Sequence, residues 1–167
     1  MIHARIKHFA FAFYWLIALL GFIGISVWFI NSAKGKDEIA IFLTAIGGLL
    51  SAFYFIQKQQ HEELELFKDL FSTFNNRYDQ LNEELNKIAF SKSKEDLLPE
   101  EKNTLNNYFN LCAEEYLFYK RGYIYPEVWR AWHNGMKFYL NKDERIKNHW
   151  VEENKSDSYY GLVIKYE

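Results

Sequence analysis

A chain of 167 residues, of which 49% are hydrophobic and 25% charged, is long enough for one domain and short for two. Aromatic residues make up 19% of it, which excludes a protein dominated by disorder or linkers. The net charge of −2 gives no global basic character of the kind that nucleic-acid binders show, and the single cysteine, Cys112, excludes an internal disulfide framework and a cysteine-based zinc site.

The first predicted element is an apolar helix from about Phe9 to Ile30, a stretch without a charged residue. At ~1.5 Å per residue it spans roughly 33 Å, enough to cross a hydrocarbon core of ~30 Å. It lacks the polar face of a helix from a soluble core. Asn31-Ser32-Ala33 is also a poor cleavage site for a signal peptide. We therefore expect a transmembrane helix.

A second uncharged stretch, from Ile39 to Ile56, follows after the short polar connection Asn31–Glu38. Its length is near the lower limit for a membrane span. The pair Gly47-Gly48 suits a close contact between membrane helices, because small residues let two backbones approach. We expect a helical hairpin that crosses the bilayer twice. The alternative is a half-buried helix lying against the first.

The basic residues near the start of the chain predict its orientation. Arg5 and Lys7 precede the first helix, and the positive-inside rule keeps such a short end in the cytoplasm. Two crossings then return residues 57–167 to the cytoplasm, whereas a single crossing would place them outside. We expect a membrane segment over residues 1–56 and a cytoplasmic domain over 57–167.

A long amphipathic helix is predicted to continue out of the second apolar stretch, because no Pro or Gly occurs between Leu49 and Leu98. After Gln57 its apolar residues follow a heptad spacing. This seam consists of Phe67, Phe71, Phe74, Tyr78, Leu81, Leu85 and Ile88. Because the aromatic residues are bulky for a two-stranded coiled coil, we favour packing within the domain over assembly between protomers.

Three shorter helices are predicted after a polar break. Pro99 and Pro126 each suit the first position of a helix, and Gly122 suits the C-terminal cap of the helix that begins at Pro99. The third helix runs from Asp143 to Glu153, and the tail over residues 159–166 is ambiguous.

The whole chain is therefore predicted to be all-α: a transmembrane hairpin, a long amphipathic helix and a cytoplasmic helical bundle. The core residues expected in the bundle are Tyr108, Phe109, Cys112, Tyr116, Trp129 and Trp132.

Acidic doublets are frequent, but the motifs of metal and phosphate chemistry are missing. The sequence contains no Glu-x-x-His pair, no HExxH, no glycine-rich phosphate loop and no nucleophile elbow, so we expect no metal and no cofactor. Glu114 and Glu115 lie on the most apolar of the shorter helices. We expect one of them to form a buried structural ion pair with Arg121 or Arg130.

Two Arg–His pairs at helical spacing suggest a weak enzymatic alternative. Arg130 and His133, like Arg145 and His149, share a helix face. An Arg followed by a His after four to six residues is the motif of the metal-independent HEPN RNases, which need an imidazole to transfer protons. Here two and three residues intervene, so both pairs miss that spacing. We favour a protein that is not an enzyme.

The block LxxYFNLCAEEYLFYKRGYI from Leu105 to Ile124, followed by Trp129, Trp132 and Trp150, resembles the helical domain of small bacterial membrane proteins encoded beside phage-defence systems. It is most similar to the membrane accessory proteins of RNA-targeting type VI-B CRISPR systems. The resemblance implies a divergent HEPN-like domain without nuclease activity and an inner-membrane location. It also implies a ring-shaped homo-oligomer that permeabilises the membrane in functional coupling to an RNA-guided effector.

A pore of this kind needs a polar lining, because a narrow apolar pore dewets and stays closed to ions. The residues expected to line it are Asn31, Ser32, Lys34, Lys36, Thr44 and Ser51. Membrane lipid is then the expected partner besides further copies of the chain, and no direct binding of nucleic acid is expected. A membrane-anchored interaction module without a pore is the remaining alternative.

Overall fold

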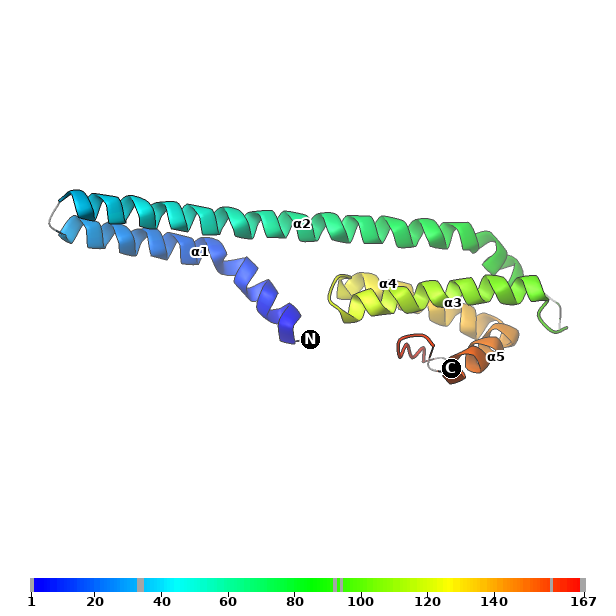
Figure 1. Cartoon of the computed structure of the whole chain (residues 1–167). Coiled ribbons are helices and arrows are strands. Elements are labelled where there is room, and N and C mark those ends of the chain that lie inside the picture. Colours follow the sequence, from blue (N-terminus) through cyan, green and yellow to red (C-terminus); the bar gives the residue numbers. More distant parts are fainter. Residues whose placement is uncertain (1, 33–34, 92, 94, 157, 166–167) are drawn as a thin grey trace. The chain divides into compact units, whose positions relative to one another are not determined.

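The computed structural model describes residues 2–32, 35–91, 93, 95–156 and 158–165, with side chains described from residue 13 onward. It contains five α-helices (Figure 1): α1 (Ile2–Asn31), α2 (Lys36–Ala89), α3 (Pro99–Lys120), α4 (Pro126–Lys142) and α5 (Glu144–Glu153). A single 3-10 turn, Asn154–Ser156, follows α5, and the described residues contain no strand. The prediction of an all-α chain is confirmed.

The chain forms two compact units, Met1–Glu65 and Leu66–Glu167. Helix α2 contributes its first part to one unit and its second part to the other, and it runs without a break over 54 residues. The absence of Pro and Gly after Gly48 explains why it does not end where the apolar stretch ends. The predicted boundary after residue 56 marks a change of composition and stays a prediction.

The first unit is a helical hairpin. Helix α1 begins at Ile2, seven residues before the predicted start at Phe9. The prediction was taken from the apolar stretch, and a helix can extend beyond the residues that contact lipid. Contacts between α1 and α2 run in opposite directions along the two helices, which makes them antiparallel (Figure 1). These contacts are Phe29 with Phe42 (ring centroids 4.3 Å apart), Gly21 with Leu49, and Tyr14 with Phe53 (5.2 Å).

The heptad seam of α2 packs within the second unit. Phe74, Leu85 and Ile88 are buried, and the partly buried seam residues Phe67, Tyr78 and Leu81 pack against the same clusters. The exception is Phe71, which is 40% exposed and stacks on Trp132 with ring centroids 5.9 Å apart. Intramolecular packing of the seam, the favoured prediction, is confirmed.

Helices α3, α4 and α5 and the tail complete this core. Phe109 of α3 meets Trp150 of α5 edge to face at 5.0 Å, and Trp150 contacts Tyr159 of the tail at 5.1 Å. Of the predicted core residues, Tyr108, Phe109 and Cys112 are buried. The other three, Tyr116, Trp129 and Trp132, are partly buried and pack against the core from its edge.

The helix ends predicted from Pro99, Gly122 and Pro126 agree with the structure. Pro99 and Pro126 each occupy the first turn of their helix, and the Leu98 amide donates to the Glu101 carboxylate at 2.8 Å. Gly122 follows α3 with φ 85°, a left-handed conformation that glycine adopts without strain.

The described part of the tail, residues 158–165, contains no strand. Tyr159, Leu162 and Ile164 are buried, so this segment closes the core as an irregular chain. A tight turn precedes Leu162, whose amide donates to the Tyr159 carbonyl at 2.9 Å. The two central residues of the turn, Tyr160 and Gly161, have φ 55° and 76°. Because left-handed backbone disfavours a side chain with a Cβ, Tyr160 is strained there.

Candidate functional site

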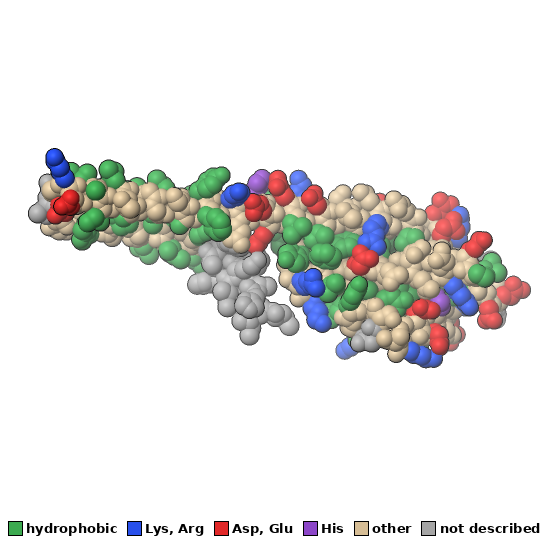
Figure 2. All heavy atoms as spheres, in the orientation of Figure 1, with side chains coloured by type: hydrophobic (Ala, Val, Ile, Leu, Met, Phe, Trp, Pro, Cys, Tyr) green, Lys and Arg blue, Asp and Glu red, His purple; other side chains and the backbone are tan. Residues whose placement is uncertain are grey.

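Most of the described surface of the helical hairpin is apolar. Large hydrophobic side chains lie exposed along α1 and the adjoining part of α2 (Figure 2), and Ile30, for example, is 69% exposed. Soluble monomers rarely expose apolar patches of this extent. Residues Phe13–Asn31 and a stretch of α2 are long and apolar enough to cross a membrane, and neither is buried against the rest of the chain.

The polar side chains of the hairpin bond to their own helix. The hydroxyls of Thr44 and Ser51 donate to the carbonyls of Ala40 and Gly47, each at 2.8 Å, four residues earlier. Asn31 and Ser32 do the same at the end of α1, at 2.7 and 2.8 Å. A polar group that is satisfied within its helix can face lipid without a further partner.

These four residues were predicted to line a pore, together with Lys34 and Lys36. Lys36 is exposed at the first position of α2, and Lys34 lies outside the described residues. The hydroxyl oxygens of Thr44 and Ser51 keep acceptor capacity that water can use. Their role as a pore lining stays a prediction.

The glycine that fits between the two helices is Gly21, not the predicted pair. A Cβ at residue 21 would lie 3.0 Å from Leu49 Cδ1, whereas a Cβ at Gly47 or Gly48 would meet no atom within 4 Å. The expected contact at Gly47-Gly48 is therefore not made with α1, because this face of α2 is exposed. Contact of that face with another helix stays a prediction.

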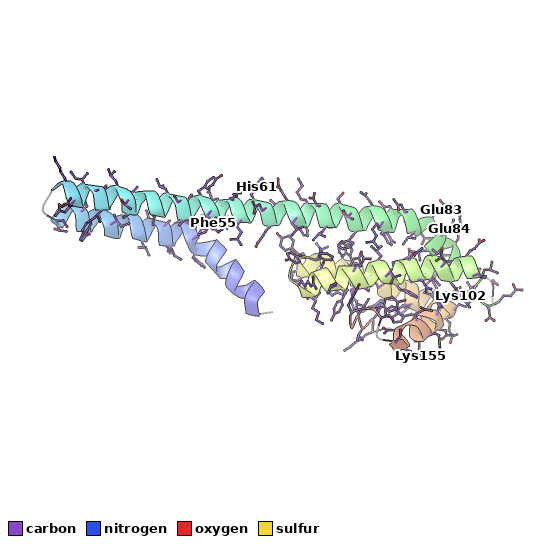
Figure 3. All side chains as sticks on the ribbon, in the orientation of Figure 1. Phe55, His61, Glu83, Glu84, Lys102 and Lys155 are labelled. Carbon is purple, nitrogen blue, oxygen red and sulfur yellow. The ribbon has the colours of Figure 1, made fainter. Side chains whose placement is uncertain are left out.

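The apolar surface of α2 gives way to charge within two turns. Phe55 is exposed and apolar, whereas His61 (labelled in Figure 3 together with Phe55) pairs with Glu65 at 3.2 Å. Lys58 and Glu62 form a second exposed pair at 3.8 Å. Such a change is typical of a helix that passes from hydrocarbon into an aqueous interface.

Glu114 pairs with an arginine that the sequence analysis did not name. Its carboxylate accepts two hydrogen bonds from the Arg77 guanidinium of α2, at 2.5 and 3.1 Å, and the bond to Glu114 raises the Arg77 pKa. Arg121 and Arg130, the predicted partners, are exposed. The prediction of a buried pair with Arg121 or Arg130 was wrong, because the partner lies 37 residues earlier in the sequence and both side chains of the pair are more than a third exposed. Arg77, the one arginine of α2, lies beside the heptad seam, and this position was the available signal.

A polar cavity of about 430 Å³ surrounds this ion pair. Three carboxamides line it, from Gln80 of α2 and from Asn107 and Asn110 of α3. The strained Tyr160 and its neighbour Ser158 contribute from the tail. No motif in the sequence joins these elements, so sequence reasoning missed this cavity.

Glu115, next to Glu114, is in a different environment. It is only 6% exposed, and burial raises its pKa to about 8, although the positive charge of Arg77 acts in the opposite direction. Its carboxyl group is therefore largely protonated at neutral pH. Burial also raises the pKa values of the adjacent Tyr108 hydroxyl and Cys112 thiol.

Arg145 and His149, the first candidate RNase pair, are held by other residues. Arg145 donates to the Asp143 carboxylate at 2.7 Å and to the Ile88 carbonyl at 3.2 Å, which ties the start of α5 to the end of α2. His149 bonds through Nε2 to the Asn106 side-chain oxygen at 2.8 Å. These contacts give both side chains a structural role.

Arg130 and His133, the second candidate pair, are in different environments. His133 stacks on Trp129 at 5.4 Å, and burial lowers its pKa, whereas Arg130 is exposed. Among the described residues no cluster of three or more His, Cys, Asp or Glu side chains is placed to hold a metal ion.

Comparisons of the chain with protein-family models, with curated proteins and with solved structures find no match. The resemblance carried by Leu105–Ile124 therefore stays a hypothesis. The features that bear on function are the exposed hairpin and the cavities of the second unit.

Proposed function

We propose that this chain is an integral membrane protein whose hairpin crosses the bilayer twice, and that several copies assemble through α2 to permeabilise the membrane. The observation that carries the proposal is the exposed hairpin itself. Its surface is apolar, and the hydroxyls of Thr44 and Ser51 are satisfied on their own helix. Water is a poor solvent for such a surface, and lipid is a good one.

Assembly is argued from one face of α2. Thr44, Gly47, Gly48 and Ser51 recur at helical spacing and so lie on the same face. A Cβ at either glycine would meet nothing within 4 Å, which leaves room for a second backbone to approach. The two hydroxyls flank this surface and supply the polar groups that a wetted path between copies needs.

Antiviral defence and coupling to an RNA-guided effector enter the proposal only through the resemblance of Leu105–Ile124. The proposed activity is not enzymatic, and the hydrogen bonds of Arg145 with Asp143 and of His149 with Asn106 support this part of the proposal.

Leakage from liposomes tests the proposal. The purified chain, reconstituted in dye-loaded vesicles, should release the dye, and a variant with both Gly47→Leu and Gly48→Leu should release much less and should sediment as a smaller assembly. Gly24→Leu is the matched control, because a Cβ there also meets nothing within 4 Å and α1 does not carry the proposed face. Equal leakage from the double variant and the parent chain would reject assembly through this face. Absence of leakage from the parent at any density in the membrane would reject the permeabilising function.

A further inference from the structure

A second cavity, of about 220 Å³, lies inside the second unit, between α2, α3 and α4. Three aromatic side chains line it, Tyr78, Tyr108 and Trp132. The remaining wall includes Glu115, Asn75 and Met136. The cavity is smaller than the ~300–1,000 Å³ typical of sites for drug-sized ligands, so it suits a small group.

Glu115 is an unusual residue for such a place. It is 94% buried, and among the residues that the structure describes none donates a hydrogen bond to its carboxyl group. A buried carboxyl without a partner destabilises a fold, and a leucine of similar size would not. The oxygens are nevertheless open to the cavity, because no described buried side-chain oxygen is sealed off without a partner. A cationic ligand in the cavity is thus positioned to neutralise the ionised carboxylate.

We infer that this cavity binds a small methylated ammonium group, held between the rings of Tyr78, Tyr108 and Trp132 and neutralised by the Glu115 carboxylate. Aromatic faces attract cations through their quadrupole, and cages of Tyr and Trp recognise methylated ammonium ions in this way. Such an ion carries no N–H group, so it needs no hydrogen-bond acceptors beyond the one carboxylate. Met136 supplies polarisable contact for the methyl groups.

The charges around the cavity balance when the cation is bound. Arg77 and Glu114 neutralise each other through two hydrogen bonds. The ionised Glu115 then leaves one negative charge, which the ligand cancels. Without a ligand the same carboxyl takes up a proton instead, so binding exchanges a proton for the cation.

Calorimetric titration of the full chain in a maltoside detergent, with choline as the probe, tests the inference. Choline should bind, and its uncharged isostere 3,3-dimethylbutan-1-ol should bind at least about tenfold more weakly, because a unit charge near a carboxylate contributes several kcal/mol at low effective dielectric. Equal binding of the two compounds would reject a cation site, and so would absence of choline binding.

A second probe distinguishes a free small cation from a lipid head group as the source of the ammonium group. Glycerophosphocholine carries the same cation on a bulky lipid head group. If choline binds and glycerophosphocholine does not, the site takes a free small cation. Tight binding of glycerophosphocholine would identify a lipid head group as the ligand, and failure of both probes would overturn the inference.

Two variants locate the site. Glu115→Gln keeps the shape of the carboxyl but not its charge, and should weaken choline binding at least about tenfold while leaving the isostere unaffected. Gly135→Leu should abolish binding of both compounds, because residue 135 lines the cavity and a Cβ there meets no atom within 4 Å. The control Glu100→Gln, in the exposed first turn of α3, should bind choline as the parent does. Unchanged choline binding in both site variants would reject this cavity.

Because binding releases a proton from Glu115, the affinity for choline should depend on pH. A merely structural role for Glu115 would not produce this dependence. Choline binding should strengthen by about tenfold per pH unit from pH 6 to 7 and level off above pH 8, as Glu115 ionises. The other groups that face Glu115 are Arg77 of α2, Glu114, Tyr108 and Cys112 of α3, and Tyr78 of α2. Arg77, Tyr108 and Cys112 have raised pKa values, so none of these three titrates in this range.

A pH-independent affinity would contradict the exchange. Because the titration needs neither a membrane nor assembly, its failure would leave the proposed pore function standing.

Discussion

Replacing Glu115 by Gln is expected to stabilise the second unit, by an amount that depends on pH. In the folded chain burial raises the pKa of this carboxyl to about 8, whereas in the unfolded chain it returns to the ordinary value near 4.5. Between these values the folded state holds a proton that the unfolded state releases. Stability of the parent chain therefore falls as the pH rises through this window.

The magnitude follows from about 1.4 kcal/mol per pKa unit. Because pH 7 lies about 2.5 units above the unfolded pKa and below the folded pKa, the parent chain loses about 3 kcal/mol of stability at pH 7 relative to acid conditions. Below pH 4.5 the carboxyl is protonated in both states, and the loss approaches zero. A glutamine cannot ionise, so Glu115→Gln should gain about 3 kcal/mol at pH 7 and little at pH 4.

Chemical denaturation in detergent, followed by tryptophan fluorescence, to which the buried Trp150 contributes, measures this difference at both pH values. Glu114→Gln is the matched control one position earlier, because it removes the charge that Arg77 holds and leaves Glu115 in place. It should destabilise by at most ~1 kcal/mol, since that pair is more than a third exposed. A gain from Glu115→Gln that does not change between pH 4 and pH 7 would refute the assignment of a buried neutral carboxyl.

Three further changes test other parts of the structure. Gly21→Leu should lower the SDS concentration that separates the hairpin helices, because its side chain would collide with Leu49, and Gly24→Leu should not; equal midpoints would contradict the contact. Tyr160→Gly should raise the free energy of unfolding by about 1 kcal/mol, since the left-handed backbone at this position strains any residue with a Cβ. A lower free energy of unfolding for the variant, measured by chemical denaturation, would contradict that reasoning. Lys34→Glu combined with Lys36→Glu should shift the ion preference towards cations in bilayer recordings, because the sign of charge at a pore mouth is reversed; identical reversal potentials would place the loop off the ion path.

The positions of the helices followed from local features of the sequence. Pro99, Pro126 and Gly122 act on the backbone of their own segment, so helix ends near them were predictable. The spacing of the α2 seam predicted a single apolar face, because side chains three and four apart lie together, and the bulk of its aromatic residues favoured packing within the domain. The irregular, buried tail was not predictable, since burial of Tyr159 depends on contact with Phe109, which is distant in sequence, as well as with Trp150.

The candidate sites depended on distant contacts and were harder to predict. Glu114 and Glu115 are adjacent in the sequence, yet one faces Arg77 and the other faces a cavity, because successive residues of a helix point about 100° apart. The sequence identified them as exceptional carboxylates without separating their roles. In the hairpin, composition predicted that a glycine would mediate a close contact, but only the register of α1 against α2 shows that it is Gly21.

Labelling of single cysteines with a membrane-impermeant maleimide tests most directly whether the hairpin crosses the bilayer twice. The native Cys112 is buried and its pKa is raised, so it gives a silent background. Asp37→Cys at the start of α2 and Lys155→Cys in the second unit both replace exposed residues. Two crossings predict that residue 37 is labelled from outside intact cells and that residue 155 is labelled only after permeabilisation. Labelling of both residues from the same side would contradict the account.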